Sequence, residues 1–137
     1  MDLQAQKIME ERFGCDALIA LATAENNAPS VRTVNAFYES GAFYVITHAK
    51  SKKMRQIEKN PAVAVSGDWF TGHGLGQNLG HILTKENEEI AQKLRAAFSA
   101  WYGNGHVNEQ DENTVILKIA LTDGVLFSQG KRYDLQF

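Results

Sequence analysis

An alternating segment joined by a tight turn to a second, mostly apolar segment constrains the fold of this chain more than any other feature of its sequence. If SVRTVNAFYE (residues 30–39) is a strand, one face carries Val31, Thr33, Asn35 and Phe37, and the other carries Arg32, Val34, Ala36 and Tyr38. Ser40-Gly41 then supplies a turn, and AFYVITH (42–48) leads back. The pattern predicts an antiparallel hairpin, with Arg32 close to Thr47 at the far end of the returning strand.

The rest of the chain extends this hairpin into a larger antiparallel sheet. Apolar or alternating runs predict further strands over residues 16–24, 62–70, 71–83, 113–122, 124–130 and 132–137. Helix signals cover residues 2–13, 51–60 and 85–102, with Ser51 and Thr84 as expected N-caps of the second and third helices. Hairpin turns outnumber helical crossovers, so we expect a mainly β fold, a β-barrel with accessory helices, in a single domain over residues 1–137.

One of the predicted strands, TGHGLGQNLGHIL (71–83), is rich in glycine. It contains four glycines between Gly72 and Gly80, but position 79 is Leu and no βαβ unit surrounds it. The spacing therefore excludes a Rossmann fingerprint. We expect a bulged strand whose backbone approaches another group closely; a flexible loop is the alternative.

Charge and cysteine content narrow the function classes. The net charge is −2, which does not favour a dedicated nucleic-acid or membrane binder, so we expect neither as a partner. A single cysteine excludes an intramolecular disulfide and fits a reducing compartment. The N-terminal residues do not resemble a secretory signal. We therefore expect a cytoplasmic protein.

The segment Thr47-His48-Ala49-Lys50-Ser51-Lys52-Lys53 is the first candidate site. It precedes a predicted helix, whose free N–H groups and dipole favour an anion. Lysines in a first helical turn oppose that dipole, so a bound phosphate would compensate for their placement. The alternative is a solvated basic turn.

Arg32 strengthens the expectation of an anion site. It shares a strand face with Val34 and Ala36, and an arginine among small apolar residues is costly to bury without an anion. Its planar guanidinium also suits a phosphate. The alternative is an edge-strand arginine that reaches water.

No pattern in the chain identifies a catalytic side chain or a metal site. Apart from His73 and His81, which leave a metal site as the alternative, the histidines lack ligand spacing with cysteine or carboxylates, and there is no GxSxG or Ser-His-Asp arrangement. We therefore name no catalytic residue and expect no metal.

Three segments together carry a family resemblance: APSVRTV, FYVITHAKSKKMRQIEKNP and VAVSGDW. They resemble the pyridoxamine 5'-phosphate oxidase-like, FMN-binding split-barrel family over roughly residues 16–83. The resemblance implies a single FMN-binding split β-barrel domain that forms a homodimer, with FMN in the groove between subunits.

The resemblance also implies roles for residues of this chain. Arg32, Lys52 and Lys53 would bind the FMN phosphate, and Thr47 and Ser51 would add hydroxyl contacts. The ring would be lined by Thr33, Val34 and Asn35. A ring-contacting glutamine of the oxidase aligns with Leu75, and Gln77 lies two residues on. The oxidase's C-terminal substrate motif is missing, because the chain ends GKRYDLQF. The chain thus looks like a short relative, of the general stress protein or nitroimidazole reductase kind, rather than the vitamin B6 oxidase.

These observations lead to one functional hypothesis and two alternatives. The first is an FMN-dependent oxidoreductase of unknown small-molecule substrate. The second is a flavin-binding or flavin-storage protein without turnover. The third is a binder of another planar anionic cofactor, haem or a deazaflavin, in the same groove.

Overall fold

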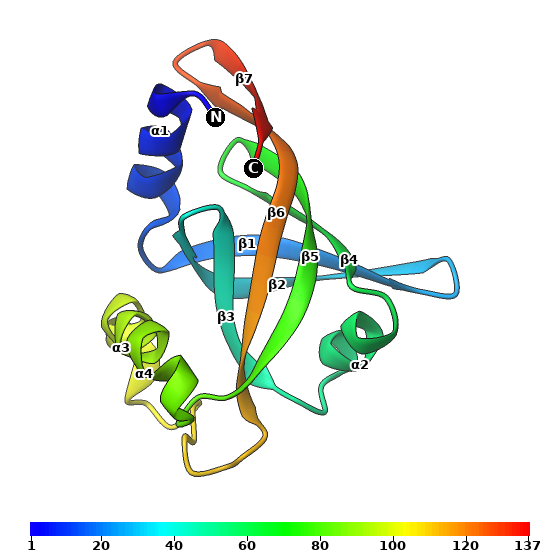
Figure 1. Cartoon of the computed structure of the whole chain (residues 1–137), viewed down its shortest axis with the longest axis vertical. Helices are drawn as coiled ribbons and strands as arrows, with labels where there is room; N and C mark the ends of the chain where they lie inside the picture. Colours follow the sequence, from blue (N-terminus) through cyan, green and yellow to red (C-terminus); the bar gives the residue numbers. More distant parts are fainter.

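The computed structural model describes residues 1–137 and contains one antiparallel sheet of seven strands (Figure 1). The strands are β1 (Ala17–Glu25), β2 (Ala28–Glu39), β3 (Ala42–His48), β4 (Ala62–Gly67), β5 (Phe70–His81), β6 (Thr114–Ser128) and β7 (Lys131–Gln136). Their order is β3-β2-β1-β4-β5-β6-β7, and β3 also pairs with β6. That additional pairing closes the first six strands into a barrel, which confirms the expected fold class.

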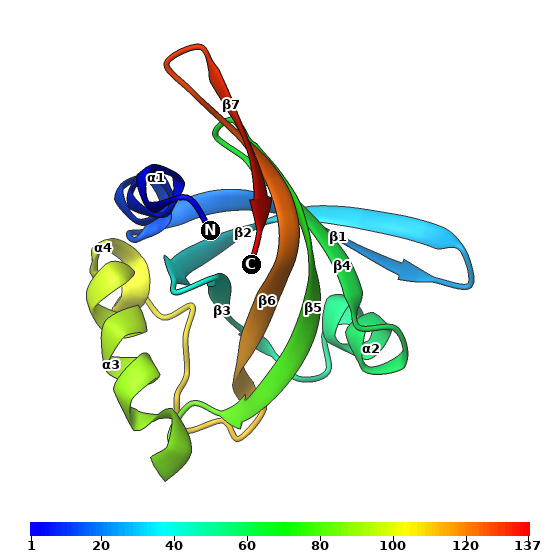
Figure 2. The same cartoon turned by 45° about the horizontal axis from the view of Figure 1, so that its top comes forward.

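Helices flank the barrel on opposite sides (Figure 2). They are α1 (Leu3–Phe13), α2 (Lys52–Lys59), the 3-10 turn η1 (Lys85–Asn87), α3 (Glu88–Ala97) and α4 (Ser99–Tyr102). Asp2 caps α1 by accepting hydrogen bonds from two backbone N–H groups, and Ala5, Met9 and Phe13 of this helix are buried. None of the helices has both the length and the apolar character needed to cross a membrane.

The inward faces of the strands and the apolar side of α1 form the main core. Its largest fully buried members are Phe13, Phe43, Phe70, Met9, Ile19, Leu21, Leu117 and Ile119. A second cluster lies outside β3 and β6, where α3 and α4 pack through Ala91, Leu94 and Phe98 against Ile82 and Ile116. Alternation along each strand therefore decides which residues face the core.

The hairpin between β2 and β3 is confirmed only near its turn. Pairing covers three residue pairs, Phe37 with Tyr44, Tyr38 with Phe43 and Glu39 with Ala42. Beyond them β2 follows β1, β3 follows β6, and α2 lies in the angle between the two strands (Figure 1). The barrel is thus split, and the pairing that was expected to bring Arg32 close to Thr47 does not form, because the strands have parted before those residues.

Several element boundaries differ from the sequence-based expectation. The expected strand 62–70 ends at Gly67, because Asp68 and Trp69 make a turn before β5. The expected strands 113–122 and 124–130 are one strand, β6, since a bulge near Thr122 bends the chain without interrupting it. The expected helix 85–102 is divided into η1, α3 and α4.

The two expected N-cap residues occupy their positions without capping. Ser51 precedes α2 but its side chain makes no capping hydrogen bond. Thr84 precedes η1, and its hydroxyl donates instead to the carbonyl of His81 at 3.0 Å. The sequence therefore predicted both helix starts correctly, but neither side chain makes the expected capping hydrogen bond.

The glycine-rich segment forms β5, where close packing explains the glycines better than flexibility does. A Cβ at Gly72 would lie 2.7 Å from the Phe70 ring, and one at Gly76 would lie 2.8 Å from Ile57 of α2. The register also shifts between His73 and Gly74 and again before His81. Both expected features, a bulge and a close approach, are confirmed.

In each of four two-residue turns, both residues have φ in the left-handed region. One of these turns places a residue type there that rarely adopts this conformation. The second residue is Asn27, Gly41, Trp69 or Gly130, with φ of 65°, 85°, 66° and 77°. Asn and Gly tolerate this conformation, whereas a bulky aromatic residue there is strained. Trp69 is also 74% exposed, so its packing contributes little that would offset the strain.

Trp69→Asn should therefore stabilise the protein by about 1 kcal/mol, since it relieves strain at little loss of packing. Urea unfolding should show a higher midpoint with an unchanged slope. Gly130→Ala is the matched control, because a Cβ at Gly130 meets no atom and only its φ disfavours alanine. It should lower the midpoint, and an equal effect of both changes would contradict the strain argument.

Candidate functional site

Arg32 lies on the inner face of β2, under α2, within a group of uncharged polar side chains. Its Nη1 donates to the Thr23 hydroxyl at 2.8 Å and to the Leu21 carbonyl at 3.2 Å, and its Nη2 lies 3.4 Å from Gln56 Oε1. Thr23 in turn donates to Gln56 Oε1, and Gln56 Nε2 lies 3.5 Å from the Ser30 hydroxyl. These contacts hold the guanidinium between β1, β2 and α2.

Lys53, in the first turn of α2, adds a second cation beside Arg32. Burial lowers the pKa of the Lys53 ammonium, and the Arg32 charge lowers it further; burial also lowers the pKa of Arg32. Neither residue belongs to any of the ion pairs of the structure. Two partly buried like charges without a carboxylate are unfavourable alone and favour a bound anion.

The start of α2 contributes further groups that suit an anion. Ser51 Oγ is buried and has no hydrogen-bond partner, which is costly for a hydroxyl. The first turn of α2 contains no acidic residue, and Lys52 within it is exposed. A phosphate at this helix start would satisfy the hydroxyl and the free N–H groups together. The residues therefore fit the phosphate end of a cofactor such as FMN.

The split in the barrel leaves one edge of β2 without a strand partner over residues 28–36, although its other edge pairs with β1. Thr33, Val34 and Asn35 lie on this edge. Thr33 and Asn35 point away from the core, Val34 points toward it, and the Asn35 amide donates to Asp16 at 2.8 Å. Free backbone N–H and C=O groups at such an edge can pair with the polar rim of a planar ring.

Thr47 lies at the end of β3 and is not part of the Arg32 group. It borders a separate hollow of about 250 Å³ whose other lining residues are Ile46, His48, Trp101, His106, Val107 and Thr114. His48 accepts a hydrogen bond from the Lys50 N–H and lies 3.5 Å from Asp111. Thr47 thus flanks the split from the β3 side.

Gln77 is not brought near the other predicted residues within one chain. It lies on the exposed side of β5, opposite Lys118 of β6. In the sheet order, two strands separate β5 from β2 in either direction around the barrel. No side-chain hydrogen bond or ion pair joins Gln77 to another predicted site residue, so its role stays a prediction.

The sequence analysis did not identify Thr23 and Gln56, two further residues of the group around Arg32. Thr23 is 2% exposed and Gln56 is 3% exposed, so both are polar residues in core positions. The signal was present for each: Thr23 continues the buried alternation of Ile19 and Leu21, and Gln56 stands between the apolar Met54 and Ile57. A polar residue in such a position indicates a specific partner.

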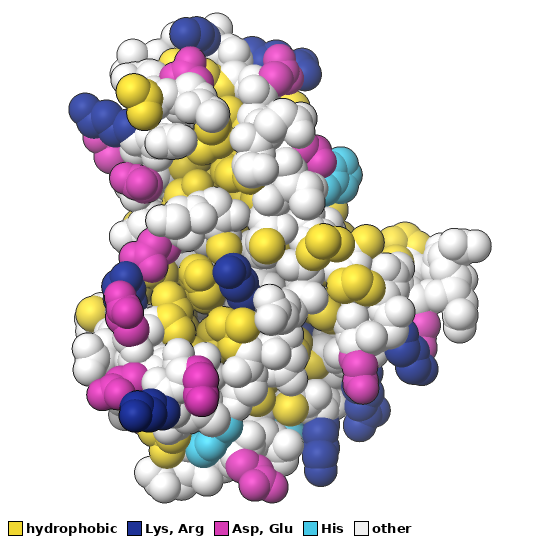
Figure 3. All heavy atoms as spheres, viewed as in Figure 1, with side chains coloured by type: hydrophobic (Ala, Val, Ile, Leu, Met, Phe, Trp, Pro, Cys, Tyr) yellow, Lys and Arg dark blue, Asp and Glu magenta, His cyan; other side chains and the backbone are white.

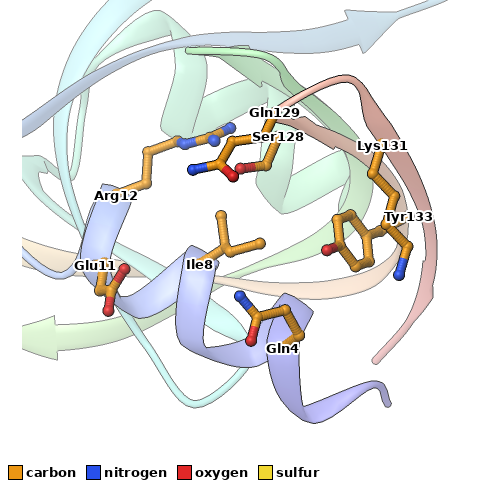
Figure 4. Close-up of a pocket in the computed structure, with 8 residues that line it drawn as sticks. All are labelled: Gln4, Ile8, Glu11, Arg12, Ser128, Gln129, Lys131 and Tyr133. Atoms are coloured by element: carbon orange, nitrogen blue, oxygen red, sulfur yellow. The ribbon is translucent and has the colours of Figure 1, made fainter.

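A larger hollow, of about 480 Å³, lies between α1 and the β6–β7 hairpin (Figure 4). Arg12 reaches from α1 toward Ser128 and Gln129, and Lys131 and Tyr133 line the far side (Figure 4). Arg12 is already engaged, because it donates to two backbone carbonyls and lies 3.8 Å from a carboxylate. This hollow contains none of the predicted site residues, so we do not assign the site to it.

The loop between α4 and β6, which borders the Thr47 hollow, is held by one partly buried carboxylate. Glu109 accepts from Arg95 at 2.7 and 3.1 Å and from the Tyr102 hydroxyl. The Arg95 hydrogen bond is the main cause of a lowered pKa for Glu109, and burial is the main cause that raises the pKa of Tyr102 to about 12.

Glu109→Gln should lower the free energy of unfolding by about 1–2 kcal/mol at pH 7. A carboxyl whose pKa is depressed on folding stabilises the protein above its unfolded pKa of about 4.3 and loses that effect as the pH falls. The difference between variant and wild type should therefore shrink below about pH 4. Urea unfolding across pH measures it, with Glu112→Gln, an exposed residue of the same loop, as the control.

Comparison with protein families gives one match, to the model described as pyridoxamine 5'-phosphate oxidase, over residues 6–126. Among curated proteins, none is similar enough in sequence to match.

Solved structures with the same fold include the general stress protein 26 from Bacillus anthracis str. Sterne. It is 20% identical, with a TM-score of 0.71, over 97% of this chain and 100% of that chain. A NimC/NimA family protein from Clostridium acetobutylicum is 21% identical, with a TM-score of 0.67, over 98% and 90% of the two chains. A FAD-binding protein from Mesorhizobium loti is 17% identical, with a TM-score of 0.65, over 90% and 91%. At these identities the likeness establishes the fold.

Proposed function

Because this chain belongs to the pyridoxamine 5'-phosphate oxidase family, we propose that it binds FMN and acts as an FMN-dependent oxidoreductase on a small molecule. Family membership and the fold support the coarser statement that it is a cofactor-binding protein of the flavin type. Our proposal adds three points to that statement: the cofactor is FMN, the protein has redox activity, and its location is cytoplasmic.

The observation that carries the proposal is the pair of unneutralised cations at the start of α2. Arg32 and Lys53 lie together without a carboxylate, beside a buried Ser51 hydroxyl that lacks a partner. A flavin phosphate would supply the missing charge and the missing hydrogen-bond partner together. Lys52, which is exposed beside Lys53, would add an outer contact. A contact from Thr47, which borders a separate hollow, stays a prediction from the family resemblance.

Each part of the chain then has a defined task in the proposed activity. Arg32 and Lys53 bind the phosphate, and the free edge of β2 at Thr33, Val34 and Asn35 borders the ring. Bound FMN would supply hydride transfer, which no side chain provides. The protein would contribute position, electrostatics and exclusion of water around the ring.

Other cofactors remain as alternatives because similar folds are described with them. A solved structure of this fold is described as an F420 reductase, and another as a heme-binding protein from Mycobacterium smegmatis. A flavin-storage protein without turnover is the further alternative. The absorption spectrum of the purified protein separates haem from flavin, and steady-state oxidation of NADH or NADPH separates an oxidoreductase from a storage protein.

The variant Arg32→Ala/Lys53→Ala should weaken FMN binding by several kcal/mol, since each change removes a charge-assisted contact of about 1.5–3 kcal/mol. Isothermal titration with FMN measures the change. The matched control is Arg55→Ala/Lys59→Ala, which removes two exposed positive charges from the same helix and should leave the affinity nearly unchanged. Equal losses in both variants would mean that the phosphate lies elsewhere.

We further propose that a second copy of this chain covers the outer face of β1, β2, β4 and β5. Leu18, Val31 and Leu75 on these strands are 64%, 70% and 50% exposed. Strand pairing sets Val31 beside Ala22, and Ala22 beside Ala64, so small residues fill the space between the larger ones. Apolar side chains gather over this region, right of centre in Figure 3. An exposed apolar face of this kind is typical of a subunit interface.

Val31→Glu should convert a dimer into a monomer, because it would bury a charge at the interface. In a single chain the side chain is exposed, so the fold should tolerate the change. Sedimentation velocity measures the mass, and Gln136→Glu on exposed β7 is the control. A wild-type protein that sediments as a monomer would contradict the proposal.

A further inference from the structure

The hydrogen-bond acceptors around Arg32 are all uncharged. The guanidinium donates to a backbone carbonyl, to the Thr23 hydroxyl and, more distantly, to the Gln56 amide oxygen. Gln56 is almost completely buried, and both ends of its amide are engaged, since Oε1 accepts from Thr23 and Nε2 faces Ser30. These partners fix the position of Arg32 without neutralising its charge.

A carboxylate of nearly the same shape would bind Arg32 more strongly than the amide does. Glutamate differs from glutamine at one terminal group, and a hydrogen bond between an arginine and a carboxylate is about twice as strong as one between neutral groups. It would also satisfy the charge that burial disfavours. With glutamine at position 56, the charge of Arg32 therefore remains available to a ligand, although a glutamate would fit the same space and bind Arg32 more strongly.

We propose that Gln56 makes this site selective for a terminal phosphomonoester. Its neutral amide holds Arg32 in place but leaves the positive charges of Arg32 and Lys53 available to bind the ligand. Such a group carries −1.5 to −2 charges at pH 7, which matches two cations. A phosphodiester offers one charge per phosphate, and a ligand without phosphate offers none. This inference rests on the proposed function and names the class of flavin that the site takes.

The test compares FMN with riboflavin, which carry the same ring but differ in the phosphate. Titrations followed by flavin fluorescence should show that wild-type protein binds FMN more tightly than riboflavin. In Gln56→Glu this preference should fall by about 10- to 100-fold, the loss of one charge-assisted contact, while riboflavin affinity stays the same. The melting temperature without flavin should not fall, because the introduced carboxylate gains Arg32 as a partner.

A control variant adds the same charge to the same helix away from Arg32. Asn60→Asp places it at the exposed end of α2, where the Asn60 side-chain oxygen accepts from the Ala62 N–H at 3.2 Å and an aspartate can do the same. It should keep the preference for FMN. If Gln56→Glu does not fold, Ser30→Asp introduces a carboxylate at the edge of the same group and should lower the preference in the same way.

The outcomes separate this inference from the proposed function. An unchanged preference in Gln56→Glu, or equal losses of FMN and riboflavin affinity, overturns the role of Gln56. Wild-type protein that binds neither flavin counts against the proposed function, and inorganic phosphate then serves as the probe. A phosphate-dependent rise in melting temperature in wild type but not in Gln56→Glu supports the inference, and equal shifts, or none in wild type, overturn it.

Discussion

The insertion of α2 into the angle between β2 and β3 is the interaction on which the rest of this structure depends. Met54 and Ile57 enter the core there, so the barrel stays filled although two neighbouring strands have parted. The same helix brings Gln56 and Lys53 to Arg32. One short helix therefore both fills the gap between the parted strands and gathers the cations of the proposed anion site.

Local signals predicted most of the elements. Alternation along residues 30–39 separated Arg32 from Thr33 correctly, because the period of a strand is fixed by its pleat. The start of α2 followed from Ser51 and the apolar spacing behind it. Arg32 was also singled out from the sequence because an arginine is costly among small apolar residues, and Lys53 because a lysine opposes the dipole at a helix start. All of these features are determined by residues that are close together in the sequence, so they can be recognised before the fold is known.

The remainder depends on contacts between distant segments. The hairpin signal at Ser40-Gly41 gives no indication that pairing stops after three residue pairs, because beyond them β2 follows β1 and β3 follows β6, each along its other edge. For the same reason, the strand pairing that was expected to bring Thr47 close to Arg32 does not form. The partners that do hold Arg32 come from β1 and α2, and a buried threonine or glutamine looks ordinary until its surroundings are known.

Phe70 occupies space that two glycines leave open. A Cβ at Gly72 would lie 2.7 Å from its ring, and one at Gly124, on the adjacent strand β6, would lie 2.6 Å from it. These three positions therefore form one steric unit. A Cβ at either glycine would also lie 2.9 Å from a backbone carbonyl oxygen, that of Asp123 or Thr71, so a smaller residue at position 70 would relieve only part of the clash. Relatives that keep this pairing of β5 with β6 should therefore keep both glycines, even where another residue replaces the aromatic ring.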